Sequence, residues 1–302
     1  MDDQLKHMEK KAVSVAREAN KICSQHKVGK FEFEAKKLIY ETQGVPAIYY
    51  NIEAWTNLRK SDIAKLKSIQ GQLLKKLFGM PQSTSYWGLL YELNITPIIN
   101  LILYKKLMLF HNLMNSDDQR VAKKIVKEQV KSGHSECWYG NLKEECVQIG
   151  LMVDEEMVMG KLKSRWKKEV KEKIEEDVER KMIIEKSERR KMRFLQKRGV
   201  DTYMKNTYNE EARMGMKIRL NMVEWIDDNM GQKSVCPLCR EEDDTTEHVF
   251  ACKEGVNIHG VTVKNLEEGE KMGEIVELFK GNERRRKEQL MDGIMLNINR
   301  VG

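Results

Sequence analysis

Hydrophobic residues along most of this chain recur at intervals of three and four positions, which is the period of an amphipathic helix. The most regular stripe follows Ser61, a residue suited to cap a helix, and it ends before Gly79 and Pro81. Its members are Ile63, Leu66, Ile69, Leu73, Leu74, Leu77 and Phe78. We therefore predict a helix over 61–78 that buries one face.

Neighbouring segments continue the helical pattern. We expect a helix over 6–23, followed by a second helical run that enters Pro46, which caps or kinks it. Residues 83–85 can cap a further short helix that continues to Leu93. Thr96 then caps a helix with Pro97 at its first position. Apolar residues surround most of that helix, which predicts that it is buried. They are Ile98, Ile99, Leu101, Ile102, Leu103, Tyr104, Leu107, Leu109, Phe110 and Leu113.

After Asp117 the pattern changes to charged helices, over 120–131, over 138–149 and from 154 onward, so we place a domain boundary near residue 117. One of these helices has an apolar residue at every fourth position, which suits an extended helix docked along one edge. This seam consists of Leu162, Trp166, Val170, Ile174, Val178 and Met182. A further amphipathic helix over 213–228 leads to a group of cysteines, and short helical runs end the chain.

The composition favours helices and a location inside the cell. A third of the 302 residues are charged, and only four are proline. The longest apolar stretch, 95–104, is about half of the ~20 residues that a membrane span needs, and the first residues lack a basic signal region. Six irregularly spaced cysteines do not suggest a disulfide framework. We expect a protein of the nucleus or cytoplasm with no membrane partner.

Three cysteines and a histidine near the C-terminus have the spacing of a metal site. Cys236 and Cys239 form a C-x2-C pair, and His248 and Cys252 lie one helical turn apart, so both pairs can face one ion. Three thiolates and an imidazole are the ligands of a closed tetrahedral zinc site, so we predict one structural Zn²⁺; the alternative is free cysteines beside a chance histidine. The loop 240–247 between the pairs is acidic and would repel phosphates.

Basic charge is concentrated in the stretch 160–198, where ten lysines and six arginines face eight acids; its net +8 exceeds the +7 of the whole chain. A helix with cations on successive turns could follow RNA or DNA phosphates, although such a helix is often only a solvated face. The predicted nucleic-acid contacts are Lys161, Lys163, Arg165, Trp166, Lys167, Lys168, Arg189, Arg190 and Arg193. The indole of Trp166 would stack on a base, and the arginines would bind phosphates.

Three groups of motifs in this chain occur together in one protein family. The first lies in 40–55, with Pro46, Tyr50, Glu53 and Trp55, although Asn51 stands where a glycine is usual. The second runs from Gln70 to Pro81 and through Ser83-Thr84, Leu90-Tyr91-Glu92-Leu93, Ile95, Pro97-Ile98 and Lys106-Leu107. The third is the Cys/His group, in which Thr246-Glu247 precedes His248. Together they resemble the C-terminal region of reverse transcriptases from non-LTR (LINE-type) retrotransposons.

The resemblance implies a mainly α protein with a thumb-like helical bundle, a charged helical linker and a small CCHC zinc module. The expected division is a palm-to-thumb connection over 1–55, the thumb over 56–116, the linker over 117–232, the zinc module over 233–256 and a helical tail over 257–302. In that family the thumb packs on the template–primer duplex, and the downstream helices and zinc module are implicated in binding RNA and DNA.

The family's catalytic carboxylates lie upstream of the matched thumb, so we expect a nucleic-acid-binding chain without the polymerase active site, whose polymerase domain would precede it. Two alternatives stay open: a truncated version of an active RNA-directed DNA polymerase, and a helical protein-interaction scaffold with a structural zinc. Asp227 and Asp228 superficially fit the family's aspartate box, but they follow the thumb-like region, so a solvated helix end is expected.

The remaining candidates for chemistry have ordinary explanations. Asp117 and Asp118 indicate a loop and a helix cap. A second metal site at His134, Cys137 and Cys146 would have only three widely spaced ligands, so we expect core thiols there. Cys23 and His26 are too few to bind a metal alone.

Overall fold

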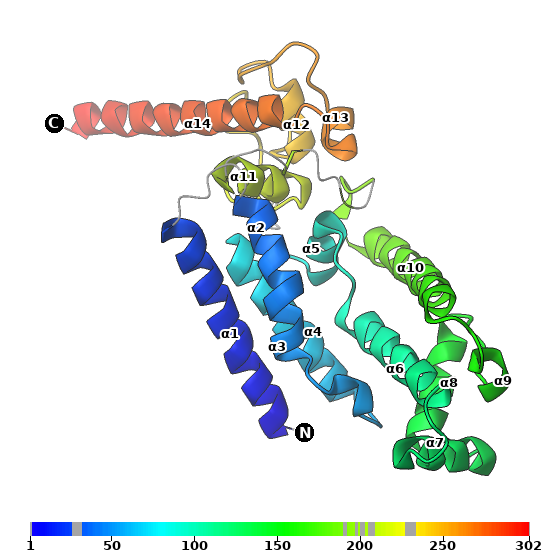
Figure 1. The fold of residues 1–302 in the computed structure, drawn as a ribbon. Coiled ribbons are helices and arrows are strands. Elements are labelled where there is room, and N and C mark those ends of the chain that lie inside the picture. Colours follow the sequence, from blue (N-terminus) through cyan, green and yellow to red (C-terminus); the bar gives the residue numbers. More distant parts are fainter. Residues whose placement is uncertain are drawn as a thin grey trace. The chain divides into compact units, whose positions relative to one another are not determined.

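The computed structural model describes residues 2–25, 32–189, 192–196, 199, 203–204, 209–226 and 234–301, with side chains as far as residue 291. In these residues the chain is mainly helical, as predicted, and β pairing is limited to one isolated bridge between Val235 and Asp243. The helices are α1 (Asp2–Gln25), α2 (Glu32–Ile39), α3 (Val45–Ile48), α4 (Lys60–Phe78), α5 (Tyr86–Leu93), α6 (Ile98–Met114), α7 (Val121–Ser132), α8 (Trp138–Gln148), α9 (Glu155–Val158), α10 (Lys163–Glu188), α11 (Asn209–Arg219), α12 (Thr246–Ala251), α13 (Val263–Glu268) and α14 (Met272–Val301). A π-helix, η2 (Tyr40–Gly44), and a 3₁₀ turn, η3 (Ile52–Ala54), complete the described helical elements (Figure 1).

The chain forms two compact units, and the first comprises residues 1–17, 40–73 and 95–185. Its central element is α6, which contacts η3, α7, α8 and α9. The predicted burial of α6 is confirmed for most of its apolar residues, including Ile98, Ile102, Leu107 and Phe110. Each such side chain stabilises the unit by about 1.5–3 kcal/mol when it leaves water.

Helix α10 docks on α6 along the predicted seam. Trp166, Val170, Ile174, Val178 and Met182 are all buried, whereas Leu162 precedes the helix and is 74% exposed. The Trp166 indole N–H donates to the Leu107 carbonyl over 3.2 Å. Near the other end of the contact, the Asn100 amide donates to the Asp177 carboxylate over 2.7 Å. The two helices therefore run antiparallel, with hydrogen bonds at both ends of their contact.

The start of α6 differs by one residue from the prediction. Pro97 is the cap and Ile98 the first helical residue, so Thr96 does not cap the helix. The N–H of Ile98 is satisfied by the side-chain oxygen of Gln70 at 2.8 Å, and the amide of Gln70 donates to the Thr96 carbonyl. Pro46 lies in the first turn of α3, which directly follows η2.

The second unit comprises residues 18–39, 74–94 and 186–302. Here α14 contacts α11, α12 and α13 (Figure 1). At the core of this unit Arg219 and Glu92 form a fully buried ion pair, with 2.7 Å between the guanidinium and the carboxylate. The Tyr203 hydroxyl donates to the same carboxylate, and Arg219 also donates to the carbonyls of Leu266 and Glu267 near the end of α13. These hydrogen bonds connect α5, α11 and the end of α13, and loss of either charge of the pair would be strongly destabilising because the other charge stays buried.

Two predicted boundaries are corrected by this architecture. Helix α6 and helix α7 contact each other within the first unit, so residue 117 is not a domain boundary. The segment 117–232 is not a linker, because its residues are shared between both units. The charged helices were assigned to a linker because most of their surface is polar, but a narrow buried edge is enough to pack a helix against the rest of its unit. The amphipathic helix expected over 213–228 is α11, which begins earlier and ends at Arg219.

Candidate metal centre

The C-x2-C pair is presented by a tight turn of the second unit. Cys236 N–H donates to the Glu242 carbonyl over 2.7 Å, and Arg240 N–H donates to the Cys236 carbonyl over 2.9 Å. Arg240 adopts the left-handed region with φ 59°, which closes the turn after Cys239. Backbone hydrogen bonds within the turn therefore hold both cysteines on one side of it.

The other two candidate ligands come from α12 and its end. Thr245 caps this helix, because its hydroxyl accepts from the N–H of His248 over 3.1 Å. Cys252 directly follows the last helical residue and forms the C-terminal cap. His248 and Cys252 are therefore one helical turn apart, as the sequence predicts, and both are buried.

All four side chains converge, with their ligand atoms within 4.8 Å of one another. The sulfurs of Cys236 and Cys252 are 3.8 Å apart, and the sulfur of Cys239 is 3.3 Å from Nε2 of His248. Two thiolates bound to one tetrahedral ion at 2.3 Å would be about 3.8 Å apart. The predicted residues Cys236, Cys239, His248 and Cys252 therefore form a cluster that could hold a metal ion.

The imidazole is oriented by a carboxylate. Nδ1 of His248 lies 3.0 Å from the Glu242 carboxylate, so Nδ1 carries the proton and Nε2 presents its lone pair to the sulfurs. Glu242 belongs to the acidic loop 240–247, whose expected effect was repulsion of phosphates. Its side chain instead has the position of a partner that fixes the histidine tautomer.

The thiols of the cluster differ in acidity. Burial opposes ionisation of Cys239, but N–H groups of Glu241 and Glu242, with His248, lower its pKa to about 7. Burial and the neighbouring Cys236 raise the pKa of Cys252 to about 11. A metal ion would therefore bind a ready thiolate at Cys239 and displace a proton from Cys252.

A buried arginine of α14, Arg286, lies next to the cluster. Both terminal nitrogens of Arg286 donate to the Asp244 carboxylate, over 2.9 and 2.5 Å, and one also donates to the Trp225 carbonyl over 2.8 Å. The guanidinium lies 4.5 Å from the centre of the Trp225 ring and 3.9 Å from the sulfur of Cys236. The sequence gives no signal for Arg286, because it follows Cys236 by 50 residues.

The predicted nucleic-acid contacts fall into separate groups. Lys163, Arg165, Lys167 and Lys168 are exposed at the start of α10 in the first unit, and Lys161 pairs with Glu169. In the second unit Arg189 is exposed, and Arg193 forms an ion pair with Glu247 over 2.7 Å. Arg190 lies outside the described residues.

Trp166 requires a correction. Its side chain is fully buried in the seam between α6 and α10, with its N–H bonded to Leu107 and the ammonium of Lys161 over its ring at 5.1 Å. The ring face is therefore not available to a base, and the predicted stacking role is wrong. The seam pattern predicts this burial, since every fourth residue faces the partner helix.

The other weak candidates do not form a site in the part of the chain that the structure describes. The Cys137 thiol donates to the backbone carbonyl of His134, and Cys146 is buried in the core. The Asp117 carboxylate accepts from the N–H of Gln119 in a loop turn. Asp227 and Asp228, and likewise His26, lie outside the described residues.

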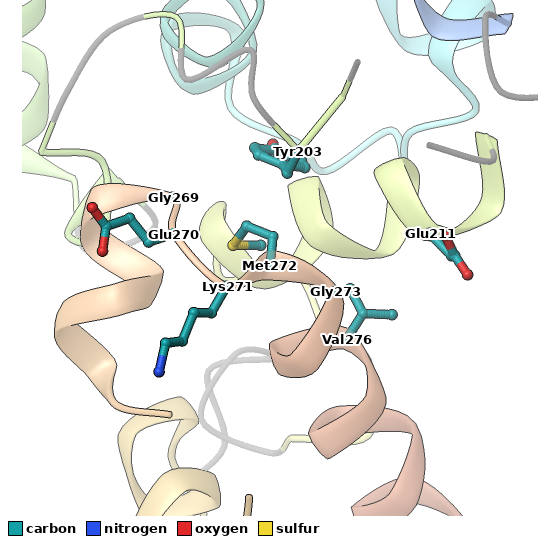
Figure 2. Close-up of a pocket in the computed structure, with 8 residues that line it drawn as sticks. All are labelled: Tyr203, Glu211, Gly269, Glu270, Lys271, Met272, Gly273 and Val276. Carbon is teal, nitrogen blue, oxygen red and sulfur yellow. The ribbon is translucent and has the colours of Figure 1, made fainter. Parts of the chain in front are cut away.

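A hollow of about 500 Å³ in the second unit lies beside the start of α14 (Figure 2). Its lining includes Tyr203, Glu211, Glu270 and Lys271. The Lys271 ammonium donates to the Gly260 carbonyl over 2.9 Å, and Figure 2 shows its side chain extending away from Tyr203. The other charged side chains among the described lining residues are carboxylates, so these residues direct no cation at a ligand.

Fold and site together define a mainly helical protein with a Cys/His cluster that could hold a metal ion. No protein-family model, curated protein or solved structure matches the chain. Among the described helices, no single one is long and apolar enough to cross a membrane; α5 and α6 reach that length and hydropathy only as a broken pair.

Proposed function

We propose that this chain binds RNA or DNA through the exposed cations at the start of α10, and that a structural zinc ion stabilises its Cys/His module. The thiolate-rich ligand set suits zinc, and four protein ligands leave no open position for catalysis. The function is therefore binding, in the nucleus or cytoplasm, where thiols stay reduced.

The observation that carries the binding proposal is the charge at the start of α10. Acidic residues normally favour the first turn of a helix, because its free N–H groups carry partial positive charge. The first turn of α10 has none, and Lys163 and Arg165 stand there instead, followed by Lys167 and Lys168. Such placement costs about 0.3–1 kcal/mol per charge near the terminus, so helix stability does not account for it.

Ion pairing does not account for these cations either. No carboxylate among the described residues pairs with Lys163, Arg165 or Lys167, and Lys168 reaches Glu172 only at 3.9 Å. Later in the same helix, by contrast, Arg180 and Lys181 both pair with Asp177, at 2.7 and 2.5 Å. A polyanion would supply the missing partners at the start of the helix and release its condensed counterions.

The resemblance to the C-terminal region of non-LTR retrotransposon reverse transcriptases is the second support. In that family the helices after the thumb are implicated in binding RNA and DNA, and α10 occupies this place in the sequence. We accordingly propose an origin in such a protein, with a polymerase domain as an upstream partner.

The test is binding of the purified chain to RNA and DNA across a salt series. Replacing Lys163, Arg165 and Lys167 by Gln should weaken binding and flatten the slope of log affinity against log salt by roughly 2–3 units on duplex, at ~0.9 per contact. A matched control replaces Lys131, Lys264 and Lys287, which pair with carboxylates elsewhere. Equal affinity and slope for both triple variants, with helicity and metal content intact, would refute the proposal.

A further inference from the structure

A groove between α6 and α10 lies next to the proposed binding residues. It has a volume of about 430 Å³, within the range of about 300–1,000 Å³ typical of ligand pockets. It lies between the two hydrogen bonds that tie the helices together, Trp166 to Leu107 at one end and Asn100 to Asp177 at the other. The groove is lined by Thr96, Leu101, Tyr104, Lys171, Glu172, Ile174 and Glu175.

The lining of the groove combines a partly exposed aromatic ring with apolar side chains. Tyr104 is half-buried, and among the described residues its ring packs against no other aromatic ring. Leu101 and Ile174 supply apolar surface beside it. Burial raises the pKa of the Tyr104 phenol, so the ring stays neutral near pH 7. A flat, partly apolar ligand could therefore cover the ring and bury its own faces.

A row of lysines leads to this ring. Lys163, Lys167 and Lys171 recur every fourth residue, so they share one face of α10 and are spaced by about 6 Å per step. The first two belong to the proposed binding residues, and the third lines the groove. All three are exposed. A strand whose phosphates follow this row would bring its bases to the groove.

We propose that the groove binds an unpaired base of a single-stranded nucleic acid, which stacks on Tyr104 while the adjacent phosphates contact Lys163, Lys167 and Lys171. This inference rests on the proposed function and adds a preference for single strands. A base in a duplex is already stacked and paired, so it cannot enter the groove without being unpaired. Tyr104 takes the stacking role predicted for Trp166, which is buried.

The acidic lining decides which part of the strand enters. Carboxylates of Glu172 and Glu175 would repel a phosphate, whereas they can accept hydrogen bonds from the N–H groups of a base edge. The occupant is therefore the base, and the phosphates stay outside on the lysine row.

The experiment measures binding of the full chain to a single-stranded oligonucleotide of about 12 nucleotides and to a duplex of the same sequence. Tyr104→Ala should weaken single-strand binding about 5- to 100-fold and leave duplex binding unchanged, while Tyr104→Phe should retain it. Tyr104→Leu keeps apolar volume without the ring and should weaken single-strand binding too. Tyr50→Ala removes a tyrosine that is 73% exposed in the same unit and serves as the control.

Fluorescence of a 2-aminopurine base placed in the strand gives an independent reading, because stacking quenches it. The quenching should disappear in Tyr104→Leu and persist in Tyr104→Phe. If Tyr104→Leu binds and quenches like the unchanged chain while the Lys163, Arg165 and Lys167 variant loses affinity, the groove assignment is wrong and the proposed function stands. If the unchanged chain binds neither strand form at low salt, both fail.

Discussion

The buried ion pair of Arg286 and Asp244 gives the sharpest test of how the second unit supports the Cys/His cluster. The two side chains are 7% and 1% exposed, and two hydrogen bonds join them. Arg286→Met retains most of the apolar stem but removes the ion pair and both guanidinium hydrogen bonds from the buried Asp244 carboxylate. The Trp225 carbonyl also loses its donor.

Removal of one partner of such a buried pair costs about 3–5 kcal/mol, since the remaining charge keeps its desolvation penalty. The double variant Arg286→Met with Asp244→Leu removes both charges, so it should lose clearly less than the sum of the two single variants. The neighbouring Lys287→Met is the control, because Lys287 is 72% exposed and forms a surface pair with Glu283. Its effect should stay within about 0.5 kcal/mol.

Native-state hydrogen exchange of the metal-loaded chain, read on the amides of 234–256, measures the free energy of opening of this segment. The expected result is a decrease of about 3–5 kcal/mol in Arg286→Met, limited by the stability of the whole unit. A decrease below about 1 kcal/mol, or strictly additive effects in the double variant, would show that the pair does not support the cluster.

Two further predictions concern the cysteines. Elemental analysis should find one zinc per chain, which is lost in Cys239→Ser and kept in Cys137→Ser; zinc retained in Cys239→Ser would contradict the site. Chelation should also make 234–256 sensitive to protease, because metal binding and folding are coupled. Alkylation of the native, metal-loaded chain at pH 8 should spare Cys146, since burial raises its pKa to about 12 and leaves almost no thiolate, and should modify the partly exposed Cys137 first. Mass spectrometry that finds Cys146 modified as fast as Cys137 would contradict the buried environment.

Local patterns in the sequence were sufficient wherever the physical cause is itself local. The three-and-four spacing predicted α4, the apolar circumference after Pro97 predicted α6, and the apolar residue at every fourth position predicted α10. Each of these patterns depends only on the geometry of one helix, whatever it packs against. The ligand spacing predicted the convergence of Cys236 with His248 and their partners for the same reason: a short turn and one helical turn position them.

Tertiary structure decided everything that depends on which faces meet. The charge count of 160–198 gave the amount of basic charge, but only packing showed that Arg180 and Lys181 share the buried Asp177 carboxylate as an ion-pair partner. The seam marked α10 as docked without identifying α6 as its partner, and so without revealing the groove at Tyr104. Arg286 reaches the cluster from a distant helix, and no sequence period encodes such a contact, because it depends on how whole helices pack and not on the spacing within one of them.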